Sequence, residues 1–136
     1  MSLAPSVMNS EPIPTLSRAR TEEMKRRTKQ LALTAVLLSQ QLPRTPEGRI
    51  LTDQLIRSAT SVAANYRAVC RSRSKREFIA KLSIVVEECD ETIFWLELLI
   101  EIPLLPPEAA HGSIAEAGEL LAIFVASRKT AQRQSG

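Results

Sequence analysis

The stretch YRAVCRSRSKREF, Tyr66 to Phe78, carries five basic side chains in thirteen residues. Arginine presents forked donors that match phosphate oxygens, and a cluster of such groups binds nucleic acid through its backbone. Motifs for base recognition are missing, because no aromatic is interleaved for stacking and no helix-turn-helix or zinc pattern is present. The pattern therefore predicts an RNA or DNA contact made by phosphate binding. The predicted nucleic-acid contacts are Arg67, Arg71, Arg73, Lys75 and Arg76.

Charge is segregated along the rest of the chain, and this supports a second interpretation. The segment 18–29 holds six basic and two acidic residues, whereas 87–101 holds six carboxylates and no base. Lys25, Arg26 and Arg27 of the first segment could assist a nucleic-acid contact. Alternatively, the basic cluster meets the acidic segment of an adjacent subunit, and the protein is a structural scaffold.

Catalytic and metal-binding patterns are absent from the sequence. It contains no glycine-rich phosphate loop, no G-x-S-x-G and no Cys/His nucleophile arrangement. A bundle di-metal site needs two Glu-x-x-His pairs, but His111 is the only histidine. Cys70 and Cys89 are predicted to be small buried thiols rather than a disulfide. We therefore expect a protein that is not an enzyme and has no cofactor and no bound metal.

The elements that must position the basic cluster are predicted to be helices. Aromatics make up only 4% of the residues and glycines number four, which favours an aliphatic helical core. The breakers PRTPEGR and PLLPP divide the chain, and Thr21 is the expected first cap. We predict an all-α, antiparallel up-down four-helix bundle, since four amphipathic helices bury their apolar faces together. Its expected parts are a flexible arm over 1–20, helices over about 21–42, 49–71, 74–101 and 107–130, and a flexible tail over 132–136.

The turn that carries the cluster has a sequence form of its own. Ser74 and Glu77 form a capping box, in which each side chain is expected to bind the backbone amide of the other residue. Lys75 and Arg76 then fall in a first helical turn, where the helix dipole disfavours cations. A cation placed against this preference suggests a further demand on the site, such as ligand contact.

Several single residues carry further expectations. Asn65 is expected to fix helix register through a buried amide, and Trp95 to pack in the core or at a subunit interface. Gly112 and Gly118 could let a neighbouring backbone approach. The second helix should bury one apolar face, made of Leu51, Leu55, Ala59, Val62, Tyr66 and Val69.

Targeting and membrane signals are not expected. The first twenty residues contain three prolines and no apolar signal core, and Glu97, Glu101 and Pro103 interrupt the most apolar run. We therefore expect a cytoplasmic protein that does not contact a membrane.

The segments LTDQLIRSATSVAANY (51–66) and SRSKREFIAKLSIVVEECDETIFWLELL (72–99) resemble the four-helix-bundle proteins encoded in intervening sequences of bacterial 23S rRNA genes. The similarity extends more loosely from about Lys29 to Ala131, and its most specific pieces include L-T-D-Q-L-x-R-S-A and R-S-x-x-E-F. The family usually continues after Asn65 with an I-A-E-G-like stretch, where this chain has YRAVC. Any role that the glutamate and the glycine of this I-A-E-G stretch have in the family therefore does not transfer to this chain.

The resemblance implies an up-down four-helix bundle that assembles as a ring, commonly a homopentamer. It also implies a relation to the accessory protein of diversity-generating retroelements, which binds nucleic acid and a reverse transcriptase. Implied partners are thus other copies of the chain, RNA or DNA, and a reverse transcriptase or other protein. Most members of the family have no established function, and no catalytic residues transfer from them.

Overall fold

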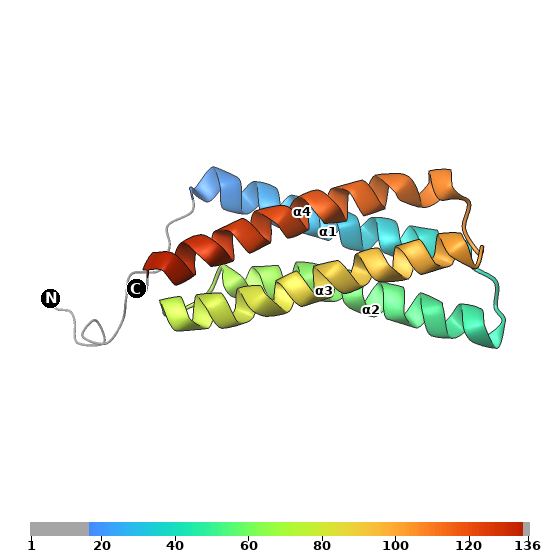
Figure 1. Ribbon diagram of the computed structural model, residues 1–136, viewed down its shortest axis with the longest axis horizontal. Helices are drawn as coiled ribbons and strands as arrows, with labels where there is room; N and C mark the ends of the chain where they lie inside the picture. The colour runs from blue at the N-terminus through green and yellow to red at the C-terminus, as the bar shows by residue number, and fades with distance from the viewer. Residues whose placement is uncertain (1–16, 135–136) are drawn as a thin grey trace, which may run out of the picture.

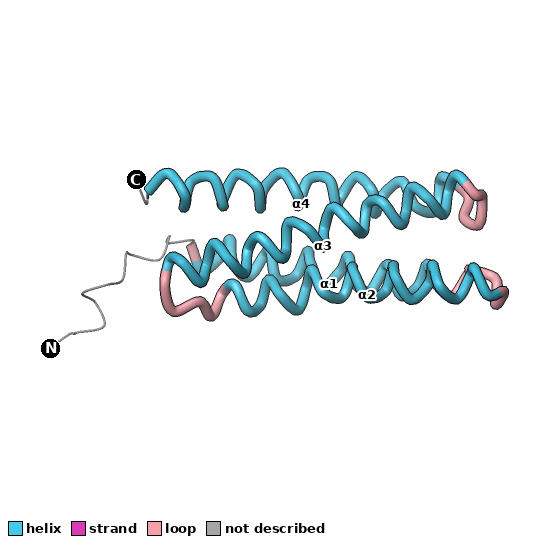
Figure 2. The backbone as a smooth tube through the Cα atoms, turned by 60° about the horizontal axis from the view of Figure 1, so that its bottom comes forward, coloured by secondary structure: helices cyan, strands magenta, loops and turns pink. Residues whose placement is uncertain are grey.

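The computed structural model describes residues 17–134, and this part of the chain forms four α-helices and no strands. Successive helices run in opposite directions and pack side by side, with α1 against α4 the lightest contact (Figure 1). Loops lie only at the two ends of the molecule (Figure 2). The prediction of an all-α four-helix bundle is confirmed. The helices are α1 (Arg18–Ser39), α2 (Pro46–Val69), α3 (Lys75–Glu101) and α4 (Pro107–Gln134).

The N-terminus of α1 corrects the predicted arm. Ser17, not Thr21, is the N-cap, and its hydroxyl accepts a hydrogen bond from the Arg20 amide at 3.1 Å. Residues 18–20 are therefore helical, and the rest of the predicted arm, 1–16, lies outside the described residues. Both Ser and Thr suit this position, but the earlier cap adds one more turn of good helix formers.

The loop between α1 and α2 has the predicted length but lies three residues earlier in the chain, at 40–45 instead of 43–48. Helix α1 stops at Ser39 rather than near Leu42, because the amides of Gln41 and Leu42 bond three residues back in a tighter turn that ends before Pro43. Helix α2 begins at Pro46 rather than Arg49, since a proline fits the first helical turn. Thr45 caps it and accepts from the Gly48 amide at 3.1 Å.

The glycines of α4 do not have the role that was expected. Gly112 and Gly118 are exposed, and a Cβ at either position would meet nothing within 4 Å. Close approach occurs instead at Gly48, where a Cβ would lie 2.1 Å from the Pro43 carbonyl oxygen. The other helix ends differ by a few residues: α2 stops at Val69 rather than 71, and α4 continues to Gln134 instead of ending near 130.

The core consists of two clusters of buried side chains, one around Tyr66, Phe78 and Phe124 and the other around Leu55 and Leu99. Trp95 packs against the second cluster and is partly buried. The apolar face predicted for the second helix is confirmed, because all six of its residues are buried: Leu51, Leu55, Ala59, Val62, Tyr66 and Val69.

A buried polar pair joins α2 to α3. Thr92 Oγ1 lies 3.0 Å from Ser58 Oγ, and both residues are fully buried. Asn65 does not have this role: it is partly buried and its amide donates to Ser61 within the same helix. The prediction that Asn65 fixes register is wrong, because its side chain turns back along α2.

One helix in the described part of the chain, Pro107–Arg133, is long and apolar enough to cross a membrane by length and composition alone. The expectation that membrane signals are absent did not anticipate this helix. Leu120 and Phe124 of this helix are in the bundle core, and Glu116 pairs with Arg27 of α1. Only 28% of the apolar window of this helix is buried, so packing inside the bundle accounts for part of its apolar residues.

Candidate nucleic-acid interface

The turn between α2 and α3 is held by Ser74 and Glu77. The Ser74 hydroxyl accepts a hydrogen bond from the Glu77 amide at 3.1 Å, which confirms half of the predicted capping box. The other half is wrong, because the Glu77 carboxylate accepts from the Arg73 amide at 3.2 Å instead of the Ser74 amide. This carboxylate also accepts from Lys81 at 3.0 Å, and these two contacts hold the pKa of Glu77 below its ordinary value.

Four of the five predicted contact residues point into solvent. Arg67, Arg71 and Arg76 are exposed and have no ion partner among residues 17–134. The Arg73 side chain is 88% exposed, and its guanidinium approaches the Glu77 carboxylate no closer than 3.5 Å. These four guanidinium groups are therefore available to a ligand.

Lys75 does not belong to the accessible set. Its residue is 3% exposed, so its ammonium group cannot meet a large ligand without rearrangement. The argument from the helix dipole also weakens, because Glu77 supplies a carboxylate in the same first turn. The predicted role of Lys75 as a phosphate contact is corrected on this ground.

The antiparallel packing brings further cations to the same end of the molecule. The start of α1, the α2–α3 turn and the end of α4 lie together at one end (Figure 1). Sequence reasoning named Lys25, Arg26 and Arg27 of α1 rather than Arg18 and Arg20, and it missed the contribution of α4, for which the only signal was the up-down order of the helices. We call this surface the basic end, and its exposed cations are Arg18, Arg20, Arg67, Arg71, Arg73, Arg76, Lys129 and Arg133.

The predicted helpers on α1 are mostly engaged in ion pairs. Lys25 pairs with Glu22 at 3.2 Å within its own helix. Arg27 binds Glu116 at 2.8 Å and Glu119 at 2.6 Å on α4. Arg26 alone of the three is exposed without an ion partner in the described residues, so Lys25 and Arg27 are better explained as structural groups.

The acidic segment of α3 is partly neutralised inside the subunit. Arg57 of α2 pairs with Glu88 at 3.0 Å and with Glu91. The Trp95 indole also donates to Glu91, at 3.0 Å, which orients that side chain. The remaining carboxylates are exposed and have no ion partner within 17–134: Glu87, Asp90, Glu97 and Glu101.

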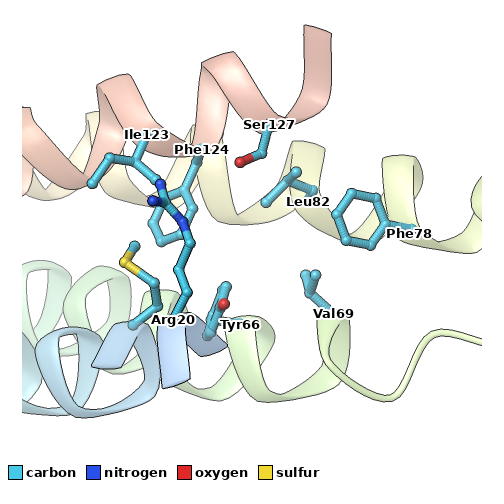
Figure 3. A pocket seen from close by; sticks show the side chains of 9 residues that line it. Arg20, Tyr66, Val69, Phe78, Leu82, Ile123, Phe124 and Ser127 are labelled. Carbon is cyan, nitrogen blue, oxygen red and sulfur yellow. The ribbon is translucent and has the colours of Figure 1, made fainter. Parts of the chain in front are cut away.

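A narrow pocket, which we call the slot, is lined by residues of all four helices beneath the basic end. Arg20 extends from α1 toward Phe124 of α4, and the Ser127 hydroxyl lies at the rim (Figure 3). The Tyr66 hydroxyl is buried there with no hydrogen-bond partner in the described part of the chain, and burial raises its pKa. The slot has room for about one water molecule, which could satisfy Tyr66 but leaves no space for a substrate.

The two cysteines differ from each other. Cys89 is buried as predicted and its thiol lies 3.2 Å from the Ala117 carbonyl oxygen. Burial raises the pKa of Cys89 to about 12. Cys70 is exposed at the end of α2, so the prediction of two buried thiols is wrong for Cys70.

Metal-binding geometry is not found in the described part of the chain. No group of three or more His, Cys, Asp or Glu side chains there could hold an ion. His111 is exposed on α4.

Comparison with known proteins identifies a family and a similar solved structure. The profile of the 23S rRNA-intervening sequence protein family matches residues 20–126. A crystal structure of a protein with unknown function from the S23 ribosomal protein family of Bacteroides thetaiotaomicron superposes with a TM-score of 0.72 and 29% sequence identity. The match covers 78% of this chain and 98% of that one. No curated protein matches this chain.

Proposed function

Because the chain belongs to the 23S rRNA-intervening sequence protein family, we propose that it is a non-enzymatic, cytoplasmic homo-oligomer that binds RNA or DNA phosphates through its basic end. The observation that supports this most directly is the gathering of eight exposed cations from three chain segments at one end. The protein from the S23 ribosomal protein family has unknown function, so the proposal depends on the site itself.

Seven of these eight cations are arginines, whose planar forks bind phosphate oxygens through two hydrogen bonds at once. Such contacts release counterions, so affinity falls steeply with salt. The only acid within the turn, Glu77, is held by Lys81 and the Arg73 amide. It therefore offsets little of the positive charge of the basic end.

Binding assays at two salt concentrations test the proposal. We expect the protein to bind a mixed RNA and DNA pool at about 50 mM salt, and to bind it about 100-fold more weakly at about 200 mM, for roughly four phosphate contacts. The variant Arg71→Ala/Arg76→Ala should weaken binding strongly. The matched control is Arg44→Ala/Arg49→Ala, which removes two exposed arginines near the α1–α2 loop, at the opposite end of the bundle. Absence of binding at low salt, or an equal effect of the two variants, would overturn the proposal.

The scaffold function is favoured by a different observation, the four exposed carboxylates of α3 that lack an ion partner among the described residues. In that case the basic end contacts the α3 face of an adjacent subunit, in a ring such as a pentamer. Reversing the charges of Arg73 and Arg76 to Glu would then dissociate the oligomer in light scattering, and nucleic acid would not bind to the wild type. An assembly unaffected by the reversal would exclude this role. A reverse transcriptase as protein partner stays a prediction, which co-purification tests.

A further inference from the structure

We propose that the basic end binds double-stranded nucleic acid in preference to single strands. This inference rests on the proposed function and names its substrate class. Two independent features of the structure support it: where the aromatic side chains lie, and how the cations are spread over the end of the bundle.

The aromatic residues leave the basic end without a stacking surface. The sequence has three Phe, one Tyr and one Trp, and all five lie in the described residues. Three of them are at the basic end, but Tyr66, Phe78 and Phe124 are only 2%, 4% and 1% exposed. These three rings pack in the core beneath the cations, so none of them is accessible to a base.

The other two aromatics are far from the cations. Phe94 and Trp95 lie on α3, 18 residues or more beyond Arg76. At 1.5 Å per residue this is about 27 Å along the helix axis. A strand held by the basic end could reach them only by running along the acidic segment of α3, where exposed Glu87 and Asp90 would repel its phosphates.

Proteins that hold single strands combine a positive groove with aromatic rings on which the bases stack. Arginine planes can also stack on bases, but a guanidinium that is not already held in place must be immobilised at an entropic cost. Arg73 is 88% exposed, and Arg67, Arg71 and Arg76 make no hydrogen bond or ion pair within residues 17–134 that would fix their planes. The basic end therefore offers charge without an exposed aromatic ring for bases to stack on.

The cations also cover an area rather than a line. They come from the start of α1, the α2–α3 turn and the end of α4, which are separate corners of the bundle (Figure 1). Neighbouring helix axes in such a bundle are about 8–10 Å apart. A duplex presents two rows of phosphates across a groove, whereas a single strand presents one. Cations at several corners match two rows, so a duplex can engage more of them at once.

Fluorescence anisotropy at about 50 mM salt tests this preference. The probes are a 20-base-pair RNA duplex, a 20-base-pair DNA duplex, and unstructured 40-nucleotide RNA and DNA strands, so that each carries the same number of nucleotides. We expect at least one duplex to bind about 10-fold tighter than either single strand. Equal or tighter binding of a single strand would overturn the duplex preference and leave the proposed function standing. Failure of all four probes to bind would overturn the proposed function together with this inference.

A pair of variants tests the two-row arrangement. Arg18→Ala/Arg133→Ala removes exposed cations of α1 and α4, while Arg71→Ala/Arg76→Ala removes two from the α2–α3 turn. We expect the first variant to weaken duplex binding about 10-fold and single-strand binding much less. The second variant should weaken both. If the first variant leaves duplex binding unchanged, the α1 and α4 corners make no contact and the two-row argument fails.

Discussion

Arg27 of α1 holds Glu116 of α4 in a two-pronged contact, with Nε and Nη2 each donating to one carboxylate oxygen at 2.8 Å. The same Nη2 also donates to Glu119 at 2.6 Å. These residues are 89 and 92 positions apart in the chain. The contact ties together the two helices that pack most lightly against each other.

We predict that Arg27→Ala lowers the free energy of unfolding by about 1–3 kcal/mol. The Arg27 side chain is only 19% exposed, and its removal eliminates the charge-assisted hydrogen bonds to Glu116. The control is Arg57→Ala, which removes a similar double ion pair from a side chain that is 45% exposed. Solvent screening should limit the effect of the Arg57 change to less than about 1 kcal/mol. Urea denaturation measures both, and equal losses would contradict the burial argument.

The Arg27–Glu116 contact also predicts a dependence on pH. Arg27 holds the pKa of the Glu116 carboxyl below its ordinary value of 4.5. A carboxyl with a lowered folded-state pKa stabilises the protein above its ordinary pKa, and this stability is lost as the pH falls through the folded value. Wild type should therefore be more stable than Glu116→Gln at pH 7, and the difference should shrink below about pH 4.5. A difference that grows on acidification would show the opposite linkage.

The helix cap at the basic end is open to a direct test. Ser74→Ala removes the acceptor for the Glu77 amide and should cost about 1 kcal/mol of unfolding free energy. Ser74→Asp keeps an acceptor at the same place and should retain most of that stability. Thermal unfolding of the three proteins compares them. Equal loss in both variants would mean that the hydroxyl acts through something other than the cap.

Two glycines are expected to respond in opposite directions to the same change. Gly48→Ala places a Cβ 2.1 Å from the Pro43 carbonyl oxygen, so the α1–α2 loop must move, at a cost of about 1–3 kcal/mol. Gly118→Ala meets no atom within 4 Å in the middle of α4 and should stabilise by about 0.5–1 kcal/mol. Chemical denaturation of both variants decides the sign at each position.

The two thiols should differ in reactivity in the folded protein. Cys70 is exposed and Cys89 is buried, with a pKa raised to about 12. A chromogenic disulfide reagent should modify one cysteine in the folded protein and both in denaturant. Although the Cys70 residue is exposed, neighbouring protein atoms desolvate its thiol and raise its pKa, so its reaction should be faster at pH 9 than at pH 7. The variant Cys70→Ser should show no fast reaction, and rapid modification of that variant would mean that Cys89 is accessible.

The sequence alone determined the helices and the apolar face of α2, from Leu51 to Val69, because helical periodicity is a local property of the chain. It also placed Ser74 at a cap and clustered five cations around it, and it carried the motifs that resemble the family. Its errors at Thr21 and Arg49 are errors of helix boundary, where several residues can serve as a cap or first turn.

Only the tertiary structure decided which charges are available. It buried Lys75, engaged Arg27 with Glu116 and Glu119, and neutralised part of the α3 acids through Arg57. It also brought Arg18 and Arg133, from opposite ends of the chain, to the same end of the bundle as Arg71. These outcomes depend on which helices are neighbours and how they are rotated about their axes. No local pattern specifies those quantities, because they are set by how all four apolar faces pack together.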